Sequence, residues 1–231
     1  MDQKTGCLVI HGFGGSIREV EPLVSALESQ GYMTSCPALK GHTANRKDLG
    51  ATNWKDWVAS AEEELLCLIR DCSKVFICGF SMGGLIGMHL AVKYPLEGLI
   101  TINSPIYYLD FKKIASNILF DLRTKDYSNI RRYLKPSNRV PFKSMLNFRD
   151  LVRTTIKLIP SLESRLLIVQ AIDDDVVHHK SAGYIYTHAV KADREVATYV
   201  RGGHVILLSD TAFSVISDIM SFLNRPAAPA R

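Results

Sequence analysis

The order of apolar and amphipathic segments predicts an α/β fold with a mostly parallel sheet of about six strands flanked by helices. Short apolar or β-branched runs recur along the chain, and helical patterns fill most gaps between them. The strand-like runs span residues 6–10, 32–36, 74–78, 99–102, 166–170 and 196–200. Strands that alternate with helices imply right-handed crossovers, which make the strands parallel and cover both faces of the sheet.

Two amphipathic segments in the first third of the chain predict helices that pack on this sheet. One stripe at i, i+3, i+4 and i+7 comprises Val20, Leu23, Val24 and Leu27, followed by Gly31 as a helix stop. The other comprises Trp54, Trp57, Val58, Ala61 and Leu65. Each stripe gives its helix a single apolar face.

Length and composition suit one globular domain. A chain of 231 residues is long enough for one α/β domain and short for two. Hydrophobic residues make up 47% and charged residues 22%, which excludes disordered and collagen-like classes.

The strand and helix alternation stops between residues 105 and 160. Two helical stripes replace it, formed by Phe111, Ile114, Ala115, Ile118, Leu119 and Leu122, and by Phe148, Leu151, Val152, Thr155, Ile156 and Ile159. We therefore predict a core of residues 1–104 and 161–231 with a helical cap at 105–160. The insertion follows a strand carboxyl end, where open α/β sheets bind ligands, so we expect a lid. A helical layer that only covers the sheet is the alternative.

The positive charge of the chain is concentrated in this insertion. Lys and Arg total 28 against 23 Asp and Glu, a net charge of +5, and residues 105–160 alone carry 12 Lys and Arg against 4 Asp. A basic, partly apolar segment suits an anionic lipid surface, so we expect transient lipid contact and no nucleic-acid partner. A solvated helical face explains the same charge equally well, and the sequence indicates no oligomeric state.

Cysteine content and the N-terminus predict a cytoplasmic protein. Five cysteines at low density, with Cys7 and Cys78 inside apolar runs, favour free buried thiols in a reducing compartment. The first residues lack the basic region and cleavage site of a signal peptide. The uncharged run 75–92 reaches the length of a membrane span, but its glycines divide it better into a strand, a turn and a helix.

The strongest local motif is Gly79-Phe80-Ser81-Met82-Gly83, a Gly-x-Ser-x-Gly that follows a predicted strand and opens a helix. A serine on such a sharp turn has a strained backbone, and glycines are needed beside it. The hydroxyl is then exposed above the sheet, where the helix N-terminus stabilises developing negative charge. A chance match in a glycine-rich turn is the alternative.

Serine needs a general base, usually a histidine oriented by a carboxylate, and in this strand–turn–helix context the chain order is serine, acid, histidine. His204 follows the strand-like run 196–200 in a glycine-containing turn. Three consecutive aspartates follow the run 166–170, so the acid remains open between Asp173, Asp174 and Asp175, with loop position favouring Asp174. Their alternative role is a solvated acidic turn.

An oxyanion hole needs two N–H groups, one from the residue after the nucleophile and one from the loop after an earlier strand. Met82 supplies the first, and Phe13 in His11-Gly12-Phe13-Gly14-Gly15 is the candidate for the second. The same loop is also compatible with a phosphate or dinucleotide cradle. It lacks the full Gly-x-Gly-x-x-Gly spacing and a following acidic residue for a ribose, which counts against that interpretation.

Several motifs in the expected order resemble the carboxylesterase and monoacylglycerol lipase group of α/β-hydrolases. They are Leu8-Val9-Ile10-His11-Gly12-Phe13-Gly14-Gly15, Gly31-Tyr32, Leu39-Lys40-Gly41-His42, Trp54-Lys55-Asp56-Trp57, the Ser81 turn, Asp174 and Gly203-His204. The resemblance implies an α/β-hydrolase fold, a Ser81-Asp174-His204 triad, an oxyanion hole from Phe13 and Met82, and a small cap over an acyl pocket. It favours Asp174 because the family acid lies three residues after a small residue, here Ala171. The chain departs from the family in having alanine there instead of glycine, and His42-Thr43 instead of His-Gly.

The other histidines do not indicate a metal site. His42 is expected to be a structural loop residue, His89 a satisfied helix residue, and the adjacent His178 and His179 surface residues without a third ligand at useful spacing. No cofactor and no metal are expected. Substrate-binding residues are predicted as Gly12 from the glycine loop and Ile114, Ile118 and Leu119 from the first cap stripe.

These features predict a serine carboxylic-ester hydrolase that acts on short- to medium-chain acyl esters or monoacylglycerols through an acyl-enzyme intermediate. A thioesterase or acyltransferase with the same triad is the nearest alternative, because the catalytic residues do not specify the acceptor or leaving group. A catalytically silent ligand-binding protein on the same fold is the alternative from another class.

Overall fold

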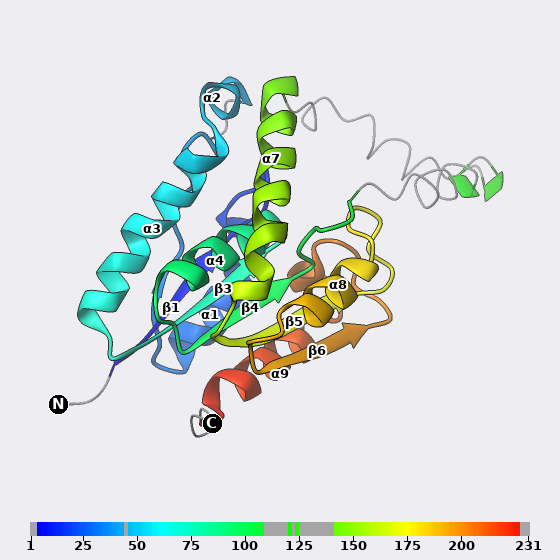
Figure 1. Cartoon of the computed structure of the whole chain (residues 1–231). Coiled ribbons are helices and arrows are strands. Elements are labelled where there is room, and N and C mark those ends of the chain that lie inside the picture. Colours follow the sequence, from blue (N-terminus) through cyan, green and yellow to red (C-terminus); the bar gives the residue numbers. More distant parts are fainter. Residues whose placement is uncertain (1–3, 44–45, 109–119, 122, 125–140, 227–231) are drawn as a thin grey trace.

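A six-stranded sheet forms the centre of the computed structural model, which describes residues 4–43, 46–108, 120–121, 123–124 and 141–226 (Figure 1). All neighbouring strands are parallel and follow the order β2-β1-β3-β4-β5-β6. The strands are β1 (Thr5–Ile10), β2 (Met33–Ser35), β3 (Lys74–Phe80), β4 (Gly98–Ile102), β5 (Arg165–Ala171) and β6 (Arg194–Tyr199). The predicted parallel α/β sheet of six strands is thus confirmed.

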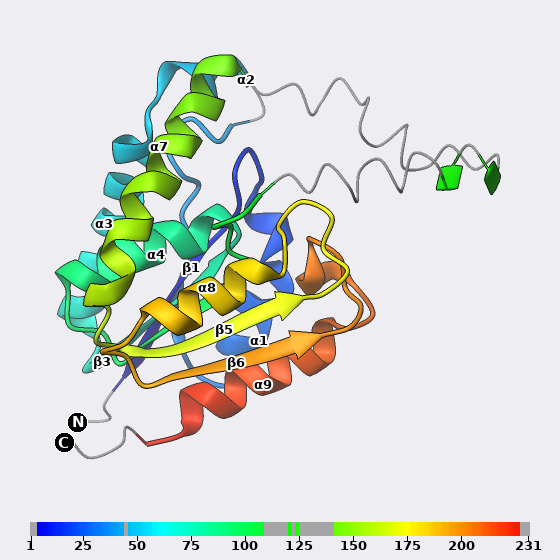
Figure 2. The same cartoon turned by 45° about the vertical axis from the view of Figure 1, so that its right-hand side comes forward.

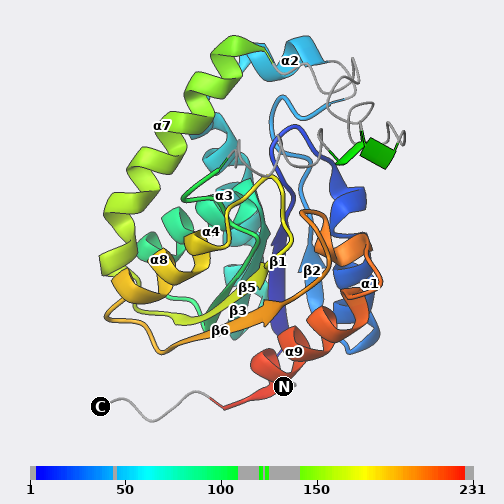
Figure 3. The same ribbon diagram turned by 90° about the vertical axis from the view of Figure 1, so that its right-hand side faces the viewer.

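Helices cover both faces of the sheet, as Figure 3 shows. On one face lie α1 (Glu21–Ser29) and α9 (Ala212–Asn224), and on the other lie α3 (Trp54–Asp71), α4 (Met82–Lys93) and α8 (Lys180–His188). Another long helix, α7 (Phe142–Leu158), packs across α3 and α4 from outside (Figure 2). Shorter elements are α2 (Arg46–Ala51), η1 (Ile17–Glu19), η3 (Ile159–Ser161) and η4 (Ile206–Leu208).

Alternation along the strands divides the core into two layers, because successive side chains of a strand point to opposite faces. In β1, Leu8 and Ile10 belong to the layer with α3, α4 and α7, whereas Cys7 and Val9 belong to the layer with α1 and α9. Cys7 is fully buried with its Sγ 3.6 Å from that of Cys78 on β3. All five cysteines are free.

The connection between β4 and β5 contains the predicted insertion. Its second stripe forms α7, in which Leu151, Val152 and Thr155 are buried against the core. The first stripe, including the predicted binding residues Ile114, Ile118 and Leu119, lies outside the described residues. The cap boundaries at 105 and 160 stay a prediction.

Residues 75–92 form most of β3 and α4, as the division at the glycines predicts. Among the residues described, no helix has both the length and the apolar character to cross a bilayer.

The strand order places a topological switch between β1 and β3. The chain passes from β1 to the edge strand β2 and then returns to β3 on the other side of β1. Ligands of open α/β sheets bind beside the carboxyl ends of the strands at such a point. Ile10 pairs with Gly79 in the register, so the glycine loop after β1 and the Ser81 turn after β3 emerge side by side.

Candidate active site

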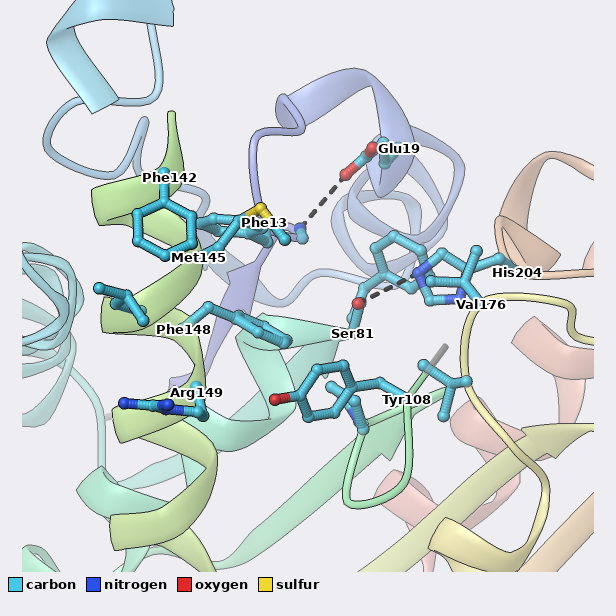
Figure 4. Close-up of a pocket in the computed structure, with 15 residues that line it drawn as sticks. Phe13, Glu19, Ser81, Tyr108, Phe142, Met145, Phe148, Arg149, Val176 and His204 are labelled. Carbon is cyan, nitrogen blue, oxygen red and sulfur yellow. Dashed lines mark hydrogen bonds between the residues drawn. The ribbon is translucent and has the colours of Figure 1, made fainter. Parts of the chain in front are cut away.

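Ser81 lies between β3 and α4 with a strained backbone, at φ 52° and ψ −117°. The turn is tight enough that a Cβ on Gly79 would lie 2.3 Å from the carbonyl oxygen of Gly83. A Cβ on Gly83 would lie 2.1 Å from the carbonyl oxygen of Ile10. Both glycines of the motif are therefore required by close backbone contacts, and the turn exposes the serine hydroxyl to a cavity (Figure 4).

Three predicted residues form one hydrogen-bonded chain. His204, in the loop after β6, has its Nε2 3.1 Å from Ser81 Oγ and its Nδ1 2.8 Å from Asp174 Oδ2. The buried Asp174 carboxylate also accepts N–H bonds from Val176 at 2.8 Å and Val177 at 2.9 Å through Oδ1. Because a carboxylate only accepts, Nδ1 carries the donated hydrogen and Nε2 faces the serine hydroxyl.

The neighbouring aspartates have different surroundings. Asp173 accepts N–H bonds from Gly203 at 2.8 Å and Gly202 at 3.3 Å, so it holds the backbone of the loop that carries His204. Asp175 is buried. Of the three carboxylates, the structure places that of Asp174 against the imidazole.

Asn103 is a further part of this arrangement that the sequence analysis missed. It follows β4 with φ 47°, a left-handed conformation that asparagine tolerates better than most residues. Its buried side-chain amide donates to the carbonyl oxygens of His204 at 2.7 Å and Gly203 at 3.0 Å. Its Oδ1 accepts from the Ala171 N–H at 2.8 Å and the Gln170 amide at 3.2 Å. Asn103 thereby joins the end of β5 to the His204 loop.

The glycine loop after β1 is held from both sides. His11 is fully buried and donates from Nδ1 to the Gly12 carbonyl oxygen at 2.9 Å, while its Nε2 accepts the Leu39 N–H at 3.4 Å. Burial lowers the pKa of His11, an effect that the bond to Gly12 partly opposes. The Gly12 N–H donates to Glu19 at 3.2 Å. The loop carries Phe13, which lines the same cavity as Ser81, and α4 begins at Met82 directly after Ser81; the oxyanion hole from these two residues stays a prediction.

A cavity of about 560 Å³ opens onto Ser81 and His204. Phe13 forms part of one wall and stacks on Phe148 of α7 with ring centroids 4.9 Å apart, and Tyr108 meets the same ring edge-on at 5.3 Å. The predicted binding residue Gly12 lines this cavity. The sequence stripe that predicts α7 did not show that its first turns face the cavity.

The remaining histidines lie outside the cavity lining. His42 packs against the rings of His11 and Trp57 at 5.2 and 5.5 Å. His89 on α4 has its Nε2 3.1 Å from Thr155 Oγ1 of α7, and burial lowers its pKa to about 4. His179 is exposed at the start of α8. Across the described ranges, no three His, Cys, Asp or Glu side chains are grouped so as to hold a metal.

A parallel sheet with helices on both faces, and a serine on the strand-to-helix turn at its switch point, define the chain as an α/β-hydrolase. Residues 2–211 match the family model described as serine aminopeptidase S33, and the chain belongs to that hydrolase family.

Two relatives of this chain are enzymes of lipid or ester hydrolysis, and one solved structure shares its fold. A thermostable monoacylglycerol lipase of a Bacillus species is 28% identical, with 96% of this chain and 91% of the lipase covered. A Bacillus subtilis carboxylesterase is 24% identical, with coverage of 94% and 92%. A solved structure from LipS and LipT, two metagenome-derived lipolytic enzymes, has a TM-score of 0.80 at 20% identity, with 96% and 94% covered. The chain is thus a serine hydrolase of the carboxylesterase and monoacylglycerol lipase type.

Proposed function

We propose that the protein hydrolyses carboxylic esters of short- to medium-chain acyl groups, monoacylglycerols among them, with Ser81 as nucleophile. The observation that carries this proposal is the hydrogen-bonded chain from Ser81 through His204 to Asp174 at the edge of an apolar cavity. This is the arrangement in which a histidine activates a serine and a carboxylate orients the histidine.

In the first half of the reaction, Ser81 Oγ attacks the ester carbonyl carbon while His204 Nε2 takes the hydroxyl proton. The carbonyl electron pair moves to the oxygen, which the Phe13 and Met82 N–H groups stabilise. As the ester C–O bond breaks, His204 returns the proton to the departing alcohol. Asp174 stays ionised and stabilises the imidazolium.

In the second half, His204 takes a proton from water, and the resulting hydroxide attacks the acyl-Ser81 carbonyl. Collapse of the second tetrahedral intermediate breaks the acyl–Oγ bond, and the proton returns to Ser81. A carboxylic acid leaves and the enzyme is restored. No cofactor is needed in either half.

The apolar wall supports the choice of substrate. Phe13, Tyr108 and Phe148 give the cavity an aromatic side, and Phe142 and Met145 of α7 extend it (Figure 4). A volume of about 560 Å³ lies in the ordinary range of small-molecule sites, roughly 300 to 1,000 Å³. An acyl chain along this wall leaves the ester carbonyl at Ser81.

A panel of esters and thioesters with acyl lengths from acetyl to palmitoyl, assayed with wild type and Ser81→Ala, tests the proposal. We expect ester hydrolysis with a preference for short to medium chains, loss of at least about a thousandfold in kcat for the variant, and labelling of wild type alone by a fluorophosphonate. Equal rates in both proteins would refute the role of Ser81. Faster turnover of thioesters than of matched esters would support the thioesterase alternative.

A further inference from the structure

A carboxylate faces the proposed active site on a wall that the reaction described above does not use. Glu19, at the end of η1, lines the cavity and accepts the Gly12 N–H through Oε2 at 3.2 Å. In Figure 4 it lies above Ser81, with its carboxylate directed toward the glycine loop. Arg149, the other charged residue among those described around the cavity, directs its guanidinium away from Ser81 and has its Nε 3.7 Å from Asp150.

The glycine loop is shaped to admit this carboxylate. A Cβ on Gly15 would lie 2.0 Å from Glu19 Oε2, closer than any real contact, so a side chain at position 15 would displace the carboxylate. The absence of a side chain at Gly15 therefore allows Glu19 to reach Gly12. Gly15 thus has a role in placing the Glu19 carboxylate, and this role is independent of the predicted oxyanion hole.

Glu19 is on the histidine side of the cavity. Glu19 Oε2 and Phe80 Cε1 both lie 3.2 Å from the position of a Cβ on Gly12, so the two side chains lie next to each other beside Gly12. The Phe80 ring is in turn 5.1 Å from the His204 ring. The α7 side chains lie on the other side of Ser81 from His204 (Figure 4). The cavity thus has an aromatic wall on α7 and a wall with Glu19, Phe80 and His204.

These two walls indicate where each part of a bound ester lies, the alcohol on one side of Ser81 and the acyl chain on the other. His204 delivers its proton to the departing alcohol, so the alcohol must lie beside His204. The acyl chain then occupies the aromatic wall. A carboxylate accepts several hydrogen bonds at once, so Glu19 can accept from a substrate hydroxyl while it holds Gly12. It also repels a negative charge on the alcohol portion.

We propose that Glu19 determines specificity for the alcohol portion of the substrate: it favours alcohols that carry hydroxyl groups and disfavours anionic ones. The inference rests on the proposed ester hydrolysis at Ser81. It places the glycerol of a monoacylglycerol, rather than its acyl chain, on the Glu19 side.

Three octanoate esters that differ only in the alcohol test this assignment: octanoylglycerol, propyl octanoate and 3-(octanoyloxy)propanoate. Glu19→Gln keeps an acceptor for the Gly12 N–H and removes the charge, whereas Glu19→Ala removes both. We expect Glu19→Ala to lower kcat/KM for octanoylglycerol about tenfold relative to propyl octanoate. We expect Glu19→Gln to raise kcat/KM for the anionic ester, 3-(octanoyloxy)propanoate, about fivefold relative to propyl octanoate.

Two further variants separate specificity from a general effect. Gly15→Ala should reproduce the preferences of Glu19→Ala by displacing the same carboxylate. Glu21→Gln makes the same charge change at an exposed position outside the cavity lining and should leave both ratios as in wild type.

Unchanged ratios in Glu19→Gln, or an equal fall for all three esters in both Glu19 variants, would overturn the assignment. The second result would mean that Glu19 only holds the glycine loop. Failure of the proposed function itself is a distinct result, since wild type would then hydrolyse none of the three esters in a Ser81-dependent manner.

Discussion

Removing the Asn103 side chain should lower both stability and turnover, because that side chain links two loops of the active site. Asn103→Ala loses four hydrogen bonds: two to the part-buried carbonyl oxygens of His204 and Gly203, and two from the buried N–H groups of Ala171 and Gln170. At about 1 kcal/mol for each bond, and about 1 kcal/mol for alanine in a left-handed conformation, we expect a loss of about 5 kcal/mol.

Thermal unfolding measures this loss. At roughly 2 to 4 °C per kcal/mol for a chain of this size, the Tm should fall by about 10 to 20 °C. In ester hydrolysis well below that Tm, kcat should fall about a hundredfold because His204 is less well placed. KM should change little, since Asn103 does not line the cavity. Asn103→Asp, which keeps the Oδ1 acceptor but turns an oxygen toward the two carbonyl groups, should also lose kcat.

A surface asparagine supplies the control. Asn147 on α7 donates to the Lys143 carbonyl oxygen of its own helix in a solvent-exposed hydrogen bond, so Asn147→Ala should remain within about 1 kcal/mol of wild type. If Asn103→Ala matched Asn147→Ala in Tm and kept kcat within about twofold of wild type, the reasoning about the linked loops would be refuted.

Three more predictions follow from the site and its helices. Asp174→Asn should lower kcat by about 10⁴-fold, whereas Asp173→Asn, which weakens bonds to Gly202 and Gly203, should cost far less; equal losses in ester hydrolysis would contradict the different roles of the two carboxylates. Burial lowers the pKa of His89 to about 4 from 6.5, so the folded state binds a proton less readily than the unfolded state, and stability falls as pH falls through this range. The free energy of unfolding in urea should drop by at most about 2 kcal/mol between pH 7 and 5, and His89→Gln should make that decrease smaller; an unchanged pH slope would argue against the effect. Gly83→Ala, whose Cβ meets backbone, should unfold at much lower urea than Gly87→Ala, whose Cβ would lie 2.8 Å from the Leu99 side chain, and equal midpoints would contradict this.

Features set by local chemistry were predictable from the sequence. The strained turn at Ser81 needs glycines on both sides, so its motif is visible in one short segment. The alternation of strand and helix predicted the parallel sheet, because crossovers allow few other arrangements. The stripe from Phe148 onward predicted α7 by the same periodic logic.

Features set by contacts between distant segments were not predictable in the same way. Asp173 and Asp174 are neighbours of the same type, and only the path of the loop decides which one faces His204 and which one holds its backbone. Asn103 and Glu19 lie in no recognisable motif, since their partners are far along the chain or inside a glycine loop. The sequence signals for these two residues are weak. Asn103 comes directly after a strand, and Glu19 comes soon after the glycine pair Gly14-Gly15.

Asn103 also marks the point at which the chain leaves the sheet for the predicted insertion. It bonds to the His204 loop and to the end of β5, and the predicted insertion begins two residues later, at Pro105. Directly after that proline, the N–H groups of Ile106 and Tyr107 donate to Ser181 Oγ at 3.2 and 2.9 Å, and Tyr108 pairs with Val177. A graft that exchanges part of the insertion for a new substrate preference therefore has to keep the chain through Tyr108, so that the contacts beside the reaction centre stay unchanged.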